Sequence, residues 1–187
     1  MSKEMIFTES IKYIQKKIKT ILNQIPRKDI EKVKKLFFKS NRIFVYGAGR
    51  SGLVAKAFAI RLVHLGFQTF VIGETITGPV QKGDLVIIVS GSGETIPAVM
   101  TGEIAHNLGA KVVSITGKKD SEIAKYADIT LFISAACDDI ERRKYAPLGT
   151  LFEVSVWVLF DGFIADLLDS KNESEENMRS RHATVEQ

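Results

Sequence analysis

Cysteine and histidine are scarce in this chain of 187 residues. Its one cysteine, Cys137, leaves no second thiol with which an internal disulfide could form. The three histidines do not have the spacing typical of metal ligands, so we expect no metal site. Long apolar runs are missing as well, because Asp161 and Asp166 interrupt the nearly uncharged stretch 154–168. That stretch is too short to cross a bilayer, and we expect no membrane partner.

A secretory leader and a nucleic-acid-binding motif are also missing. The N-terminus is charged from Lys3 onward and lacks an apolar stretch of about 7–15 residues. The sequence has no zinc pattern, no aromatic-rich RNA motif and no separate helix-turn-helix segment. Its 26 basic and 22 acidic residues give a net charge of +4, which fits solvated helix faces. We therefore expect a cytoplasmic protein without a nucleic-acid partner.

Two helical patterns precede a region in which short apolar runs alternate with helical ones. Isoleucines at helical spacing predict a first helix over 6–25, and a second follows Pro26 over 29–39. Beyond Asn41, strands are expected at 42–46, 68–72, 84–89, 111–116 and 129–133. Further helices are expected at 51–65, 95–108, 121–126 and 148–168.

This alternation predicts an α/β fold. Short runs rich in Val and Ile are typical of strands that are buried on both faces. Successive strand–helix–strand units then give a five-stranded parallel sheet with helices on both sides, a three-layer α-β-α sandwich. We expect one domain over 1–187, with a helical arm over about 1–40 and a tail over about 170–187. The first helix either reaches a partner subunit or packs on its own sheet.

Two turns rich in glycine and hydroxyl groups stand out, each between an apolar run and a helical pattern. The first reads GAGRSG over 47–52, and the second reads SGSGET over 90–95. A strand that ends in such a turn and opens a helix presents free backbone N–H groups to an anion. Parallel strands place these turns at one edge of the sheet, where ligands bind in such folds. Two turns together indicate a small phosphorylated ligand.

The second turn is the more specific of the two. Ser90, Ser92 and Thr95 offer hydroxyl groups around a helix N-terminus, and Gly91 and Gly93 allow close backbone approach. The turn lacks the lysine of a P-loop, so hydrolysis of a nucleoside triphosphate is not expected. A helix start capped by serine, with no ligand, is the alternative.

The first turn also fits the G-x-G-x-x-G pattern of dinucleotide-binding proteins. Glu74 lies 22 residues after Gly52, close to the spacing of the acid that binds ribose. Arg50 would crowd the pyrophosphate, however, and the second turn has no place in that pattern. A nicotinamide-dependent oxidoreductase therefore stays a secondary hypothesis.

With the segment PLGTLFE over 147–153, the two turns resemble the sugar isomerase (SIS) domain family over residues of about 30–170. Within it, VIGET over 71–75 and the tail MRSRHATVE over 178–186 are similar to the 6-phospho-3-hexuloisomerases. The resemblance implies a flavodoxin-like SIS fold and interconversion of 3-hexulose 6-phosphate and fructose 6-phosphate, a step of the ribulose monophosphate pathway. It implies a cis-enediol(ate) intermediate, no cofactor, and a homo-oligomer, either a dimer or a homotetramer.

The resemblance also assigns roles to residues. It gives substrate binding to two loops: Gly49, Arg50 and Ser51 in the first, and Ser90, Gly91, Ser92, Gly93, Glu94 and Thr95 in the second. Glu153 would be the catalytic base. The alternative is that Glu153 is only an acidic residue in the first turn of its helix, where the helix dipole favours a negative charge. His182 would assist acid–base catalysis by folding back or by entering a neighbouring subunit's site, or it is a disordered tail residue. His64 is expected at a helix end or interface, with a role in a neighbour's site as the alternative.

Other functions remain open at this point. An arabinose 5-phosphate or heptose phosphate isomerase would use the same loops. A sugar-phosphate sensor without catalysis would need the loops but not Glu153. The acidic and basic run over 138–144 is expected to be a solvated loop, or else a cover for the site.

Overall fold

Five short strands form one parallel sheet in a computed structural model that describes residues 5–135 and 140–183. Along the sheet the order is β2-β1-β3-β4-β5. The strands are β1 (Ile43–Gly47), β2 (Thr69–Val71), β3 (Leu85–Ser90), β4 (Lys111–Thr116) and β5 (Ile129–Phe132). Each lies within a residue or two of its predicted bounds, and the predicted α/β fold is confirmed.

Both faces of the sheet are covered. Every residue of the central strand β3 is buried. Successive side chains alternate between two apolar clusters, as strand geometry requires: Ile87 belongs to one cluster, and Val86 and Ile88 belong to the other. The near-continuous apolar runs of the sequence therefore reflect a sheet with a core on each side.

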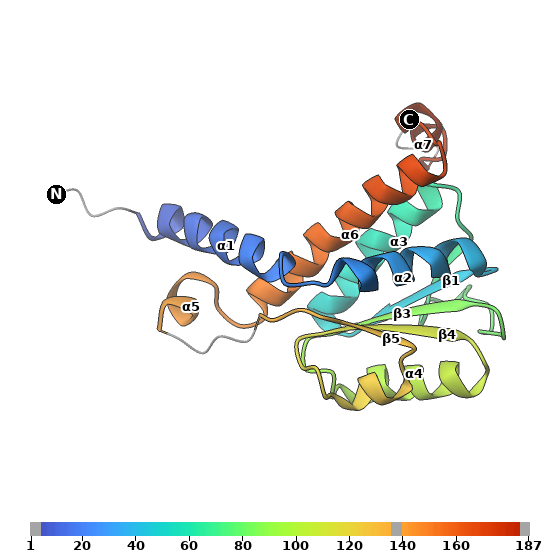
Figure 1. The fold of residues 1–187 in the computed structure, drawn as a ribbon, viewed down its shortest axis with the longest axis horizontal. Coiled ribbons are helices and arrows are strands. Elements are labelled where there is room, and N and C mark those ends of the chain that lie inside the picture. Colours follow the sequence, from blue (N-terminus) through green and yellow to red (C-terminus); the bar gives the residue numbers. More distant parts are fainter. Residues whose placement is uncertain (1–4, 136–139, 184–187) are drawn as a thin grey trace.

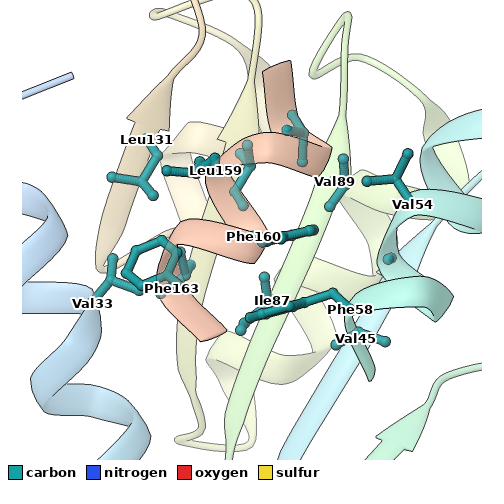
Figure 2. Packing of buried hydrophobic residues seen from close by; sticks show 14 of the residues in the cluster. Val33, Val45, Val54, Phe58, Ile87, Val89, Leu131, Leu159, Phe160 and Phe163 are labelled. Carbon is teal, nitrogen blue, oxygen red and sulfur yellow. The ribbon is translucent and has the colours of Figure 1, made fainter. Parts of the chain in front are cut away.

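Three helices cover one face of the sheet, whereas one helix and a short 3-10 helix cover the other (Figure 1). The first face carries α2 (Arg27–Lys39), α3 (Gly49–His64) and α6 (Thr150–Ser170). The second carries α4 (Ile96–Asn107) and the short 3-10 helix η1 (Glu122–Tyr126). Figure 2 shows Phe58 and Phe160 stacked between α3 and α6, with ring centroids 3.9 Å apart. This stack holds the two helices that carry the site described below.

Three helices lie outside these layers. The first, α1 (Ile6–Leu22), extends away from the sheet, and α5 (Ile140–Tyr145) lies near α1 (Figure 1). The two are joined where Ser10 Oγ donates to the Tyr145 carbonyl at 2.5 Å. The prediction of a loop over 138–144 is wrong for its described part, which forms α5. The tail expected over about 170–187 contains the short helix α7 (Glu175–Arg179), which Ser174 caps by accepting from the Asn177 amide.

Some predicted features cannot be placed. Cys137, Asp138 and Asp139 lie outside the described residues, as do positions 184–186 of the tail motif. Across 5–135 and 140–183, none of the helices combines the length and apolar character needed to span a membrane.

Candidate functional site

The strand order brings the two glycine turns together. The order of the chain along the sheet reverses between β1 and β3, and ligands bind at such a reversal in open α/β sheets. In the register of these two strands, Gly47 lies opposite Val89. The turn that follows β1 therefore lies beside the turn that follows β3, at the carboxyl edge of the sheet.

Backbone contacts fix the direction of the second turn, the phosphate loop over residues 90–95. The carbonyl of Gly91 accepts from the Gly117 amide at 3.0 Å, and that of Gly93 accepts from the Ile123 amide at 3.1 Å. The C=O and N–H of a trans peptide point in opposite directions. Anchoring both carbonyls on the segment after β4 thus turns the following N–H groups away from that segment, and the second of them, the Glu94 amide, donates to Ser92 Oγ at 3.2 Å.

Three hydroxyl groups converge at this loop, just before α4. Ser90 Oγ and Ser92 Oγ each lie 3.4 Å from Thr95 Oγ1. Ser90 Oγ also accepts from the Gly93 amide at 3.1 Å, which closes the turn. Hydroxyl donors at a helix N-terminus, where the helix dipole is positive, suit an anionic group.

Glycine is required in the first loop. Gly49 has φ +56°, a conformation that side chains disfavour. A Cβ on Gly52 would lie 2.5 Å from the carbonyl oxygen of Gly47, so a larger residue would push α3 away from β1. The loop thus delivers Arg50 and the half-buried Ser51 at the start of α3.

Arg50 and Glu153 are the charged centre of the site. Arg50 Nε lies 2.6 Å from Glu153 Oε2, although the two residues are more than 100 positions apart. The Arg50 side chain is 58% exposed, whereas that of Glu153 is only 14% exposed. The Glu153 carboxylate lies over Gly149, since a Cβ there would be 2.9 Å from Glu153 Oε1. A sheltered carboxylate beside an accessible guanidinium can exchange a proton and stabilise a nearby negative charge.

Glu94 lies in the phosphate loop but forms an ion pair with a residue outside the loop. Its Oε1 lies 2.7 Å from Nζ of Lys118, which follows β4. The hydrogen bond from Lys118 holds the pKa of Glu94 below its usual value, against a smaller opposing effect of burial. Sequence reasoning missed Lys118, and its position two residues after the predicted strand 111–116 was the available signal.

His182 does not reach Glu153 within one chain. Its ring stacks on that of His64, with centroids 4.0 Å apart, and the neighbouring Arg181 donates to the His64 carbonyl at 2.9 Å. Arg50 lies near the start of α3 and His64 ends it, so about 21 Å of helix separates them. His64 is thus the helix-end residue that the sequence predicted.

Glu74, the acid weighed for nucleotide recognition, lies outside this cluster. It is half-exposed and pairs with Lys56 of α3 at 2.5 Å. Within the described part of the chain, no group of three or more His, Cys, Asp and Glu side chains could hold a metal ion.

Known proteins resemble this chain in sequence and in structure. The 3-hexulose-6-phosphate isomerase of Bacillus subtilis is 36% identical, and the match covers 96% of this chain and 98% of that protein. The enzyme of the same name from Methylomonas aminofaciens is also 36% identical, over 91% of this chain and 94% of its own. A crystal structure of a hypothetical protein from Methanococcus jannaschii, for which 3-hexulose-6-phosphate isomerase activity was inferred, superposes with a TM-score of 0.85 at 28% identity. That match covers 95% of this chain and 99% of the other.

The model of one protein family also matches the chain. It is described as the SIS domain, and the match covers residues 36–148. That range contains β1 to β5 and both loops of the site. The chain belongs to the SIS domain family.

Proposed function

We propose that this protein interconverts 3-hexulose 6-phosphate and fructose 6-phosphate. The observation that carries the proposal is the pairing of Glu153 with Arg50 beside a loop of hydroxyl and amide donors. Two relatives that share about a third of the sequence over nearly its full length carry this activity in their names. A cytoplasmic location and a place in the ribulose monophosphate pathway are part of the same proposal.

The geometry suggests how the residues divide the reaction. The phosphate group binds at the hydroxyls of Ser90, Ser92 and Thr95, which fixes the distance of the sugar carbons from α6. Glu153 removes the proton from C2 of 3-hexulose 6-phosphate, and the electron pair moves through a C2–C3 enediolate onto the C3 oxygen. Arg50 stabilises that oxygen, a proton passes from the C2 hydroxyl to the C3 oxygen, and Glu153 returns the first proton to C3 as the C2 carbonyl forms.

The substrate itself sets one condition. A C3 ketone could close a five-membered ring only through O6, and O6 carries the phosphate. The 3-hexulose enters as an open chain, and ring opening is needed only for fructose 6-phosphate in the reverse direction.

Exposed apolar side chains next to the site support the proposal that a second copy of the chain covers it. Leu53, Ile96 and Leu148 are 65%, 72% and 85% exposed, and each lies within a few residues of a site residue. Leu148 also has φ +55°, an unfavourable conformation for a residue whose side chain is mostly exposed. We therefore propose a homo-oligomer, either a tetramer or a dimer, in which His182 acts in a neighbouring subunit's site.

The activity test couples the purified protein to a 3-hexulose-6-phosphate lyase, with fructose 6-phosphate as substrate and formaldehyde as readout. We expect release that depends on this protein. Glu153→Gln should lose turnover yet bind fructose 6-phosphate, whereas the matched control Glu74→Gln, at an exposed ion pair, should keep both. Normal turnover by Glu153→Gln would remove Glu153 as the base, and binding without turnover by the wild type would point to a sensor.

Mixing inactive variants tests the position of His182. If His182 acts across a subunit boundary, oligomers that combine Glu153→Gln and His182→Ala chains should regain about a quarter of the wild-type activity. Half of the randomly formed subunit pairs contain one chain of each kind, and one of the two sites in such a pair has both wild-type residues. If His182 acts within its own chain, mixing restores nothing.

A further inference from the structure

The phosphate loop carries a negative charge where an anion should bind. Glu94 lies between the two residues, Gly93 and Thr95, that shape the loop. Hydroxyl and amide groups supply dipoles there, but no positive charge. A carboxylate in this position repels a phosphate dianion unless a cation offsets it.

Lys118 is that cation, and its backbone is fixed beside the loop. Its amide donates to Thr116 Oγ1 at 3.2 Å, and the preceding residue, Gly117, donates to the Gly91 carbonyl at 3.0 Å. The side chain is 57% exposed and ends on Glu94. The main chain therefore holds Lys118 against the loop, while its ammonium group is free to change partners.

The charges around Lys118 favour such a change. The hydrogen bond to Glu94 raises the pKa of Lys118, and Asp120 and Glu122 add to this effect, so the ammonium stays charged at neutral pH. The nearby Lys125 is held by both carboxylate oxygens of Glu122, at 2.6 and 2.7 Å. Lys118 has a single carboxylate oxygen at 2.7 Å and leaves donors for a second anion.

We propose that Lys118 binds the substrate's phosphate group and that Glu94 competes with the phosphate for it. In the free protein Lys118 pairs with Glu94, and in the complex the phosphate takes its place. Glu94, which the family resemblance assigned to substrate binding, thus opposes binding and sets its strength. This inference rests on the proposed sugar-phosphate site.

Two variants test the competition because it predicts effects of opposite sign. We expect Lys118→Met to weaken binding of inorganic phosphate and fructose 6-phosphate about fivefold, the size typical of one exposed charge pair. Glu94→Gln, which frees Lys118, should tighten both by about two- to fivefold. Titration calorimetry at low salt gives the affinities, and 0.5 M salt should shrink both effects, at a Debye length of about 4 Å.

A brace that only shapes the loop would behave differently. Removing either partner would then loosen the loop, so weaker binding by Glu94→Gln, or unchanged binding by Lys118→Met, would overturn the inference. The pair Lys125–Glu122 gives matched controls, since Lys125→Met and Glu122→Gln make the same charge changes on η1. These should change affinity less than about twofold.

Two further measurements keep the test decisive. Lys118→Arg preserves the charge and should retain most of the affinity, so that failure of Lys118→Met to fold does not stop the test. If the wild-type protein binds neither inorganic phosphate nor fructose 6-phosphate, the proposed function itself fails. If the wild type binds and converts its substrate while Lys118→Met and Lys118→Arg match it, only the role of Lys118 is lost.

Discussion

Substituting Gly93 tests how tightly the phosphate loop is packed on the segment that follows β4. Gly93 has φ +67°, and a Cβ there would overlap Cβ and Oγ of Ser121 and lie 2.7 Å from Thr116 Oγ1. Gly49, in the first loop, is a matched control. Its φ is +56°, and a Cβ there would meet no atom within 4 Å.

The expected magnitudes follow from this difference. A left-handed conformation costs an alanine about 1–2 kcal/mol at either position. The smaller conformational entropy of the unfolded chain offsets part of this cost, equally for both variants. Only Gly93→Ala must also displace Ser121 or the loop, which adds about 1–3 kcal/mol, as in an overpacked core. We expect Gly93→Ala to lower the free energy of unfolding by at least about 1 kcal/mol more than Gly49→Ala does.

Urea unfolding followed by circular dichroism measures both variants, with unchanged m-values as the condition for comparing them. The double variant Gly93→Ala/Ser121→Gly should recover much of the difference, because it removes the two atoms that overlap. Equal losses for Gly93→Ala and Gly49→Ala, or no recovery in the double variant, would refute the packing argument.

Two more predictions concern charged groups. The Asp84 side chain is 1% exposed and accepts a hydrogen bond from Arg42 Nη2 at 2.7 Å. Asp84→Ala should lower the free energy of unfolding by urea by about 3 kcal/mol, because it leaves the Arg42 guanidinium without its carboxylate partner. A decrease of less than about 1 kcal/mol would contradict this. A hydrogen bond from Asn177, and more weakly the Arg181 ion pair, hold the pKa of Glu173 below its usual 4.5 against the effect of burial. The contribution of the Glu173 carboxylate to stability is therefore fully present above pH 4.5, and it is lost as the pH falls through the lower pKa of the folded state. The difference in Tm between the wild type and Glu173→Gln should accordingly vanish in acid. A difference that persists at low pH would show that the carboxylate charge is not its source.

Local sequence patterns were sufficient to predict most of the fold. The strand over 111–116 has the predicted bounds, because a run rich in Val and Ile between two glycines leaves little choice. The two glycine turns were expected at one sheet edge, and their adjacency follows from the pairing of β1 with β3. The short helix α5 was not foreseen, since its charged sequence has no apolar periodicity and none of its residues is buried.

The site was harder to predict because its contacts span the chain. Family motifs named Arg50 and Glu153 separately, but their ion pair depends on how α3 packs against α6. Lys118 carries no motif and matters only through its distance to Glu94. The stacking of His182 on His64 likewise depends on where the tail folds, which no local pattern encodes.

The register between β1 and β3 has a consequence for how such a protein can diversify. Both loops of the site continue directly from these neighbouring strands, so the strand spacing of about 4.8 Å sets the distance between them. Buried residues fix that spacing, and the loop residues do not. Either loop can therefore change its side chains, and with them the sugar it accepts, while the placement of the two loops beside each other is inherited unchanged. A new substrate specificity could thus arise one loop at a time.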